Sequence, residues 1–333
     1  MGKTDAPIKV AVVGCGAVAE LGHLPAIRQS PAFRLYALVD LNQARAKSLN
    51  HDGSAIVTTD YREIIERVDL SIIATPPASH AKIAIDFLQQ KKPVLIEKPM
   101  ALTSEDAHKI LAAAEANSTF VAVGHMRRFF PLLRFAQDLL VRCQAFGPVR
   151  SLVFSNGGSL DTWPFASDYV VQSEQAGGGV LMNFGPHLYD TLLWWFDTLE
   201  LESYEDDAAG GIEVNCRARL KAAGSIDVEI HMSYTDLLVP ECYVETEQAT
   251  VTFSPLESIM AIRLRDGQRT KLHLLDAPKV TLPWVMTMQL ENIRQFMVGK
   301  QELACPPRHA LRVVELLEES YAKRRPLHLP WSN

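Results

Sequence analysis

The sequence predicts a two-domain α/β protein whose N-terminal part forms a doubly wound parallel sheet. Strand and helix patterns alternate from residue 8 to about residue 126, as expected where each crossover between parallel strands carries a helix. A glycine-rich turn directly follows the first apolar run, and the alternation gives way to β-like segments from Val149 onward. The length of 333 residues also suggests two domains of ordinary size.

Composition and charge indicate a globular protein with a small-molecule partner. Apolar residues make up 47% and charged residues 22% of the chain, which is enough to bury a full core. The net charge of -6 and the lack of a dense Lys/Arg run argue against nucleic acid or an anionic membrane as the main partner. The five cysteines show no CxxC or paired spacing, so we expect reduced thiols, no metal site and a cytoplasmic location. We expect neither a membrane span nor a signal peptide.

The first strand, Ile8 to Val13, leads directly into the turn GCGAVA, which has the pattern G-x-G-x-x-A. Gly14 permits a tight turn, Gly16 lets backbone N–H groups approach a pyrophosphate, and Ala19 lets the following helix lie close to the strand. The positive end of that helix attracts the anion. The cofactor contacts expected in this turn are Gly14, Gly16, Ala17 and Val18.

The second strand, Arg34 to Val39, ends in Asp40, which lies 21 residues after Ala19. An acid at this distance is expected to bind the ribose hydroxyls of a dinucleotide. A carboxylate accepts hydrogen bonds from those hydroxyls in NAD but repels the 2′-phosphate of NADP. NAD is therefore favoured as the cofactor, and Arg45 on the next helix leaves NADP open as the second choice.

Alternation continues along the rest of the N-terminal part and gives about six strands. Further strands are expected at Ala55–Thr58, Leu70–Ala74, Val94–Ile96 and Thr119–Val123, and helices at residues 20–30, 42–50, 61–67, 81–90 and 104–117. Thr75 and Pro76 follow a strand at the carboxyl edge of the sheet, where ligands of such folds bind, so we expect both to touch the cofactor. His80, near the next helix start, is counted with the cofactor site, and a structural role is favoured over a catalytic one.

The segment VLIEKPM, from Val94 to Met100, holds the central catalytic candidate. Its apolar strand ends abruptly in Glu97, Lys98 and Pro99, which places Lys98 at the ligand-binding edge of the sheet. An isolated lysine at a strand end would ordinarily be a surface residue. Glu97 is counted with the cofactor site, and we expect it to hold the strand end or Lys98 rather than to perform chemistry.

The second half of the chain predicts a sheet that is covered on one face, because its segments show partial period-two alternation. These segments are Val149–Asn156, Ile212–Leu220, Ser225–Ser233, Glu241–Thr246, Ala249–Phe253 and Ile259–Arg265. Between the first two lies GGGVLMNFGPHLYD, which continues into a helix that carries His187 and Asp190 on one face. Two more helices are expected at 288–298 and 308–323, and a strand-like segment follows at Pro326–Leu329.

Four segments, VAVVGCGAVAE, IIATPPASH, VLIEKPM and VGHMRRFFP, together resemble the Gfo/Idh/MocA family of NAD(P)-dependent sugar and polyol oxidoreductases. The resemblance covers nearly the whole chain. It implies a Rossmann domain at residues 1–126 and a C-terminal α+β domain at 127–333 with an open, mostly antiparallel sheet. It also implies a carbohydrate-like substrate and a homodimer or homotetramer.

In the family, the glycine-rich stretch reads GGG-x-x-x-D-x-G-x-H-x-x-D, and its first Asp and its His line the active site with the EKP lysine. This chain keeps His187 and Asp190 but has Asn183 in place of the first acid. An amide can orient a hydroxyl but cannot carry a proton on and off. Asn183 could instead be a helix-entry cap ahead of Pro186. The expected catalytic residues are Lys98, His187 and Asn183.

The resemblance implies hydride transfer between a nicotinamide and a hydroxyl-bearing or carbonyl carbon. Lys98 would bind the reacting oxygen, and His187 is favoured over Lys98 as the group that takes the proton. Expected substrate contacts are Arg127, Asn156, Trp163, Tyr169, Asn183 and His187. A salt bridge at the crossover is an equal alternative for Arg127. Two other functions remain open: an NAD-dependent glycoside hydrolase that oxidises its sugar transiently, and a dinucleotide-binding regulator without turnover.

Overall fold

The computed structural model describes residues 6–159, 168–208, 211–235 and 238–327, and all structural statements below concern these residues. The N-terminal part is a six-stranded, wholly parallel sheet in the order β3-β2-β1-β4-β5-β6. Its strands are β1 (Ile8–Val13), β2 (Phe33–Val39), β3 (Ile56–Thr58), β4 (Leu70–Ile73), β5 (Val94–Ile96) and β6 (Val121–Val123). Each begins and ends within two residues of its predicted bounds, and the doubly wound sheet is confirmed.

The strand order reverses between β1 and β4, which lie side by side in parallel register. A reversal of this kind leaves a crevice beyond the carboxyl ends of the strands, where ligands bind in such sheets. The loops after β1, β4 and β5 therefore meet at one edge of the sheet, and they carry the glycine-rich turn, Thr75 and Lys98.

Helices cover both faces of this sheet. They are the π-helical turn η1 (Ala19–His23), α1 (Leu24–Gln29), α2 (Gln43–Leu49), the 3-10 helices η2 (Tyr61–Arg67) and η3 (Pro77–Ser79), α3 (His80–Gln89) and α4 (Ser104–Ala116). Two separate hydrophobic cores result. One joins the sheet to α3 and α4, and the other joins it to α1 and α2.

The C-terminal part is a nine-stranded mixed sheet in the order β14-β13-β12-β11-β7-β10-β9-β8-β15. Only the β7–β10 and β8–β15 pairs are parallel, so the expected mostly antiparallel sheet is confirmed. Its strands are β7 (Val149–Gly157), β8 (Leu199–Asp206), β9 (Asn215–Ala222), β10 (Ile226–Ser233), β11 (Glu241–Thr246), β12 (Ala249–Phe253), β13 (Ile259–Leu264), β14 (Arg269–His273) and β15 (Arg324–Pro326). The sequence patterns missed β8 and β14.

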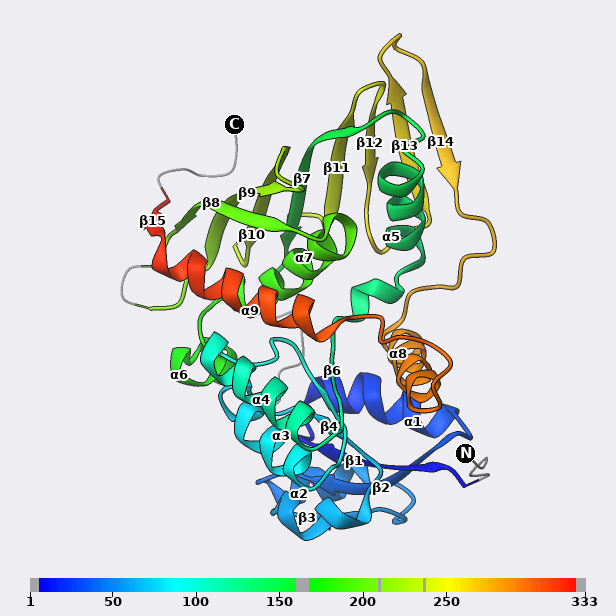
Figure 1. Cartoon of the computed structure of the whole chain (residues 1–333), viewed down its shortest axis with the longest axis vertical. Helices are drawn as coiled ribbons and strands as arrows, with labels where there is room; N and C mark the ends of the chain where they lie inside the picture. Colours follow the sequence, from blue (N-terminus) through cyan, green and yellow to red (C-terminus); the bar gives the residue numbers. More distant parts are fainter. Residues whose placement is uncertain (1–5, 160–167, 209–210, 236–237, 328–333) are drawn as a thin grey trace.

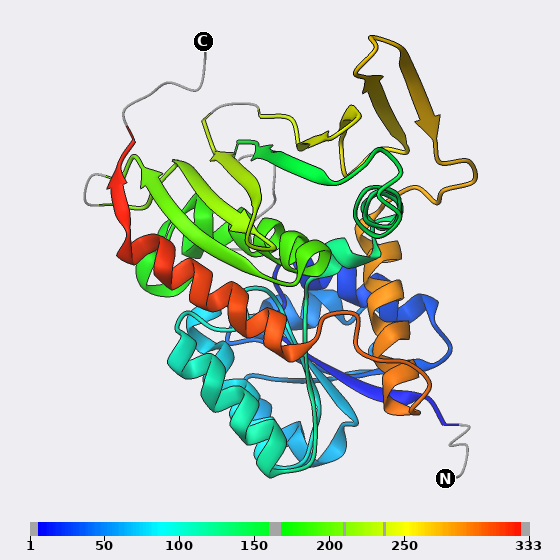
Figure 2. The same ribbon diagram turned by 45° about the horizontal axis from the view of Figure 1, so that its top comes forward.

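The remaining helices accompany the C-terminal sheet, and some of them lie between it and the N-terminal part (Figures 1 and 2). They are the 3-10 helix η4 (Met126–Phe129), α5 (Pro131–Ala136), the π-helical η5 (Gln137–Arg142), η7 (Asp168–Val171), α6 (Ser173–Ala176), α7 (Val180–Phe196), α8 (Leu282–Met297) and α9 (Pro307–Ala322). Helix α7 is buried nearly all round because it packs on β9 and β10 and also against α9 and η4.

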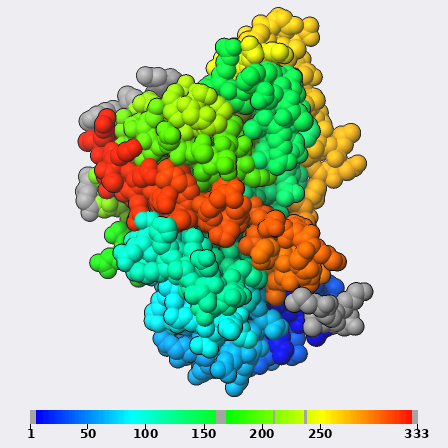
Figure 3. All heavy atoms as spheres, in the orientation of Figure 1, coloured from blue at the N-terminus to red at the C-terminus, as the bar shows by residue number. Residues whose placement is uncertain are grey.

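The last two helices return to the nucleotide-binding part and close its cores. Met286, Leu290 and Ile293 of α8 join the core beside α1, whereas Ala310 and Val314 of α9 join the core beside α4. Figure 3 shows these helices as an orange-to-red band between the lower, blue part and the upper, green and yellow part. In the described part of the chain, no helix has the length and apolar character needed to cross a membrane.

Candidate active site

The turn after β1 combines a glycine with positive φ and an open side. Gly14 has φ +95°, and a Cβ there would lie 2.5 Å from the carbonyl oxygen of Ala74, so no other residue fits at this approach of two loops. A Cβ on Gly16 would meet no atom within 4 Å, so this side of the turn is open. The partly exposed Val18 precedes η1. The turn therefore fits the phosphate role expected for Gly14, Gly16, Ala17 and Val18.

Asp40 lies next to this turn and is partly exposed. Its Oδ2 accepts a 2.8 Å hydrogen bond from the backbone N–H of Cys15, and its Oδ1 accepts a 2.8 Å bond from the N–H of Asn42. These bonds fix the carboxylate at the edge where a ribose would lie. Arg45 is close by, since its Nε donates to the carbonyl of Cys15 at 2.6 Å, but its guanidinium also pairs with Glu20.

Lys98 links the two parts of the molecule. From the loop after β5, its Nζ donates to the backbone oxygen of Asn183 at 2.9 Å and to Asn183 Oδ1 at 3.2 Å. Burial lowers the pKa of Lys98 to about 8, the charge of Glu97 opposes this shift, and the charge of Arg127 adds to it. The ammonium is therefore held at α7 and titrates close to physiological pH.

Glu97 lies behind Lys98 and is buried. Its Oε1 is 2.7 Å from Nε2 of His23, and its Oε2 accepts a 3.3 Å bond from the backbone N–H of Lys98. Burial alone would raise the pKa of Glu97, but the bond to His23 and the charges of His23 and Lys98 outweigh it and hold the pKa below its usual value. This geometry matches the expectation that Glu97 holds the strand end and Lys98.

His187 lies one helical turn beyond Asn183 on α7 and is 9% exposed. Burial lowers the pKa of His187 well below its ordinary value, and the charges of Lys98, Arg127 and His125 act in the same direction. The ring is therefore neutral at pH 7. Its buried Nδ1 has no hydrogen-bond partner among the described residues.

Asn183 lies inside the first turns of α7, and its interpretation as a helix-entry cap is wrong. The helix begins at Val180, and Asn183 N–H donates to the carbonyl of Gly179, the N-cap residue. The cap comes from elsewhere: Oε1 of the buried Glu213 accepts hydrogen bonds from the N–H groups of Gly179 at 2.9 Å and Leu181 at 3.0 Å. A distant carboxylate thus satisfies the helix start that carries Asn183 and His187.

Close packing at this helix start explains the three glycines. A Cβ on Gly177 would lie 2.4 Å from Leu102, one on Gly178 would lie 1.8 Å from the Tyr321 hydroxyl, and one on Gly179 would lie 2.0 Å from the Glu213 carbonyl oxygen. Tyr321 also donates to the Glu213 carboxylate at 2.9 Å. The glycines therefore let three segments converge on the helix that holds the candidate catalytic residues.

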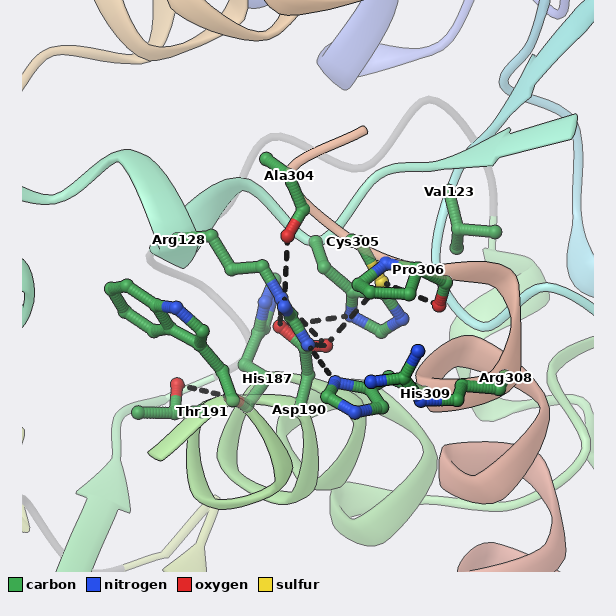
Figure 4. Close-up of polar contacts among 12 residues, drawn as sticks. Val123, Arg128, His187, Asp190, Thr191, Ala304, Cys305, Pro306, Arg308 and His309 are labelled. Carbon is green, nitrogen blue, oxygen red and sulfur yellow. Dashed lines mark hydrogen bonds and ion pairs between the residues drawn. The ribbon is translucent and has the colours of Figure 1, made fainter. Parts of the chain in front are cut away.

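Asp190 belongs to a buried ionic cluster (Figure 4). Arg128 donates to both of its oxygens, at distances from 2.7 to 3.1 Å, and also to His309 and the carbonyl of Ala304. His125 and Cys305 bring possible metal-ligating atoms to the same carboxylate. Because the guanidinium already balances its charge, and burial raises the pKa of the Cys305 thiol, this cluster is structural.

We predict that Asp190→Asn destabilises the protein by about 3 to 5 kcal/mol, because Arg128 would stay buried without a counter-charge. Chemical denaturation of wild type and variant measures this difference. Asp138→Asn, which removes an exposed partner of Arg142, is the matched control and should change stability by less than about 1 kcal/mol. Equal effects of the two substitutions would contradict the structural role of Asp190.

The loop after β4 holds three other predicted residues. Thr75 and Pro76 are partly exposed, and the Thr75 hydroxyl accepts a 2.7 Å bond from Ser79. His80 is buried, with its ring nitrogens 2.9 Å from the carbonyl of Pro99 and 2.8 Å from that of Thr75. His80 therefore ties the loops after β4 and β5 together, and its contact with a cofactor stays a prediction.

Arg127 of η4 contacts Asn156 of β7. Nη2 of Arg127 donates to Oδ1 of the buried Asn156 on β7 at 3.2 Å. Tyr169 lies in the same electrostatic environment, since burial and the charge of Glu97 raise its pKa. Trp163 lies outside the described residues.

Sequence reasoning did not single out His125, although it lies two residues after the end of strand β6, at the ligand-binding edge. It is 2% exposed, and neither ring nitrogen has a hydrogen-bond partner among the described residues. Its Nδ1 lies 3.8 Å from Asp190, and a cavity of about 10 Å³, the size of one water molecule, lies against it beside Gln289. Glu213 was also missed, and its loop carries no pattern that could have indicated it.

Comparison with known proteins agrees with this geometry. Residues 8–125 match the family model of an oxidoreductase family with an NAD-binding Rossmann fold. Oxidoreductase P35 of Formosa agariphila is 29% identical over 327 residues, which cover 94% of this chain and 98% of that protein. An inositol 2-dehydrogenase of Rubrobacter xylanophilus is 35% identical over 127 residues, or 37% of each chain.

Solved structures share the whole fold. KijD10, a 3-ketoreductase from Actinomadura kijaniata in complex with NADP and TDP-benzene, has a TM-score of 0.84 at 19% identity over 97% of this chain and 100% of that chain. The aldose-aldose oxidoreductase of Caulobacter crescentus, complexed with glycerol, has a TM-score of 0.81 at 20% identity over 95% and 97% of the two chains. At these identities the likeness establishes the fold.

Proposed function

Since this chain belongs to the Gfo/Idh/MocA family of NAD(P)-dependent oxidoreductases, we propose that it moves a hydride between NAD and the hydroxyl-bearing carbon of a sugar, polyol or nucleotide-linked sugar. The observation that carries the proposal is the contact of Lys98 with Asn183, one turn before His187. It joins the ligand edge of the nucleotide-binding sheet to the helix of the second domain. The inositol dehydrogenase and ketoreductase among the similar proteins support this substrate class.

The residues of this chain divide the chemistry between them. Bound NAD supplies the hydride acceptor for alcohol oxidation. The Lys98 ammonium binds the reacting oxygen and stabilises negative charge as it develops. The neutral His187 ring accepts the hydroxyl proton, and its lowered pKa keeps it ready to do so at pH 7. The Asn183 amide orients Lys98 and the substrate hydroxyl without exchanging a proton.

We assign residues 1–126 to nucleotide binding and residues 127–333 to substrate binding and self-association. The proposal includes a cytoplasmic homo-oligomer, which the family membership and the free cysteines support. Sedimentation of the purified protein tests the oligomeric state.

The test is nicotinamide absorbance with NAD and a panel of polyols, sugars, sugar acids and nucleotide sugars. Formation of one NADH per oxidised substrate supports the dehydrogenase. Cleavage of a glycoside without net NADH formation would instead identify a hydrolase that oxidises its sugar transiently. Binding of NADH, seen by its fluorescence, with no turnover of any substrate would favour a regulator.

Cofactor preference depends on the carboxylate of Asp40. We predict that Asp40→Ser lowers kcat/KM for NAD by about 10- to 100-fold, the effect of losing charge-assisted hydrogen bonds to the ribose. Use of NADP should rise, because the repulsion of its 2′-phosphate is removed while Arg45 stays nearby. Initial rates with both cofactors measure the change. A wild-type enzyme that already prefers NADP would contradict the assignment of NAD.

A further inference from the structure

The candidate active site contains a half-buried arginine, Arg127, for which the described residues supply no acidic partner. Nη2 of Arg127 donates to the neutral amide of Asn156 at 3.2 Å, whereas Nη1 is buried and has no hydrogen-bond partner among the described residues. Burial lowers the pKa of Arg127 to about 10, which is still well above neutral pH. The guanidinium therefore remains a cation with an unused donor.

The next residue along the chain, Arg128, is an arginine whose charge is neutralised by a carboxylate. Arg128 is 2% exposed, and its guanidinium donates to both oxygens of Asp190 and to a backbone carbonyl. The two arginines are adjacent in η4, yet among the described residues only Arg128 has a carboxylate partner. Burying a guanidinium without such a partner costs free energy, which indicates that Arg127 has a role in binding a ligand rather than in stabilising the fold.

Arg127 acts on the reacting groups. Its charge lowers the pKa values of both Lys98 and His187, so all three face one region. Among the described residues in that region, the acid is Glu97, and His23 already binds its carboxylate at 2.7 Å. Asn183, which Lys98 contacts, contributes only an uncharged amide to this region. In the part of the chain that the structure describes, the region therefore holds two cations, Lys98 and Arg127, and one acid, Glu97, which already binds His23.

We propose that the substrate carries an anionic group, a carboxylate or a phosphate, and that Arg127 binds it through Nη1. The inference rests on the proposed function, and it narrows the substrate to an acidic sugar. A planar guanidinium forms hydrogen bonds to both kinds of oxyanion. The anionic group of the substrate would neutralise the charge of Arg127, for which the described residues supply no acid. Arg127 is then the residue that determines specificity, and Lys98 and His187 perform the chemistry.

The experiment compares matched substrates that differ in one anionic group: glucose with glucuronate and glucose 6-phosphate, and galactose with galacturonate and galactose 6-phosphate. Wild type is expected to favour one anionic member over its neutral parent by at least about 10-fold in kcat/KM. The uronate and phosphate arms identify which anion is bound. Arg127→Met should lower the anionic-to-neutral ratio by about 10- to 100-fold, and Arg127→Lys should recover part of it.

Arg142→Met is the matched control, because it removes an exposed arginine from the same part of the chain. It should leave the ratio at the wild-type value. A wild-type preference for neutral sugars, or a ratio that Arg127→Met does not change, would overturn the inference while the dehydrogenase itself stands.

Binding separates this inference from the proposed function. Quenching of NADH fluorescence measures equilibrium binding of each sugar to the enzyme–NADH complex without turnover. Selective binding of the anionic sugars, abolished by Arg127→Met, would support the anion site even without turnover. The absence of turnover with every sugar would reject the dehydrogenase but not the anion site. Equal binding of the neutral and anionic members would overturn the anion site.

Discussion

Lys98→Met is expected to lower kcat by about 10²- to 10³-fold, the usual effect of removing one donor to a developing oxyanion. Methionine keeps the apolar stem of the side chain and removes both the charge and the hydrogen bonds to Asn183. Initial rates at saturating NAD measure the loss, and NADH fluorescence shows whether cofactor affinity changes with it. Lys82→Met, at an exposed lysine of α3, is the control and should retain full activity.

The pH profile decides what Lys98 does. The pKa of Lys98 is about 8, so the ammonium loses its proton as the pH rises through that value. If Lys98 acts as a cation that holds the reacting oxygen, kcat/KM falls above about pH 8. If Lys98 were the base, kcat/KM would rise through the same range. The fall in kcat/KM above about pH 8 should be absent in Lys98→Met. If the fall persists in this variant, another group causes it.

Local patterns in the sequence predict the nucleotide-binding part well. Its strands are short and mostly buried, and β4 and β5 are buried throughout, so each appears as an apolar run between turn residues. The glycine turn, Asp40 and Lys98 all follow such strands directly. Because the carboxyl ends of parallel strands share one edge, chain order alone places these residues together.

The C-terminal sheet was less predictable because two of its strands have unusual composition. Strand β8 reads LELESYED, in which the glutamates disfavour a strand, although Leu199, Leu201 and Tyr204 are buried on one face. Strand β14 is an exposed edge with almost no apolar residue, so alternation could not indicate it. Both strands depend on pairing with a neighbour that lies elsewhere in the chain.

Long-range contacts of the candidate site were beyond sequence reasoning. Glu213 caps α7 from a loop more than 30 residues away, and Arg128 reaches Asp190 across 62 residues. No periodicity or spacing connects such pairs. The family pattern predicted His187 and Lys98 in one site, but it did not distinguish Arg127, which has no carboxylate partner among the described residues, from Arg128, which pairs with Asp190.

His187→Gln is expected to lower kcat by about 10²- to 10⁴-fold, the range for loss of a general base. Glutamine retains a polar side chain of similar length but cannot take a proton at neutral pH. The measurement is kcat from pH 5 to 9 beside the Lys98→Met series. Burial among Lys98, Arg127 and His125 holds the pKa of His187 well below its ordinary value, so protonation of this ring should lower wild-type activity only at the acid end of the range.

Comparison of the Lys98→Met and His187→Gln variants shows which residue accepts the proton of the substrate hydroxyl. A neutral His187 and a cationic Lys98 coexist only between their two pKa values, so the proposed mechanism requires a plateau bounded by an acid limb and by a limb near pH 8. His187→Gln should remove the acid limb and leave the alkaline one. If kcat in His187→Gln stayed within a few-fold of wild type while activity rose through pH 8, the proton would pass to Lys98. The histidine would then position the substrate hydroxyl.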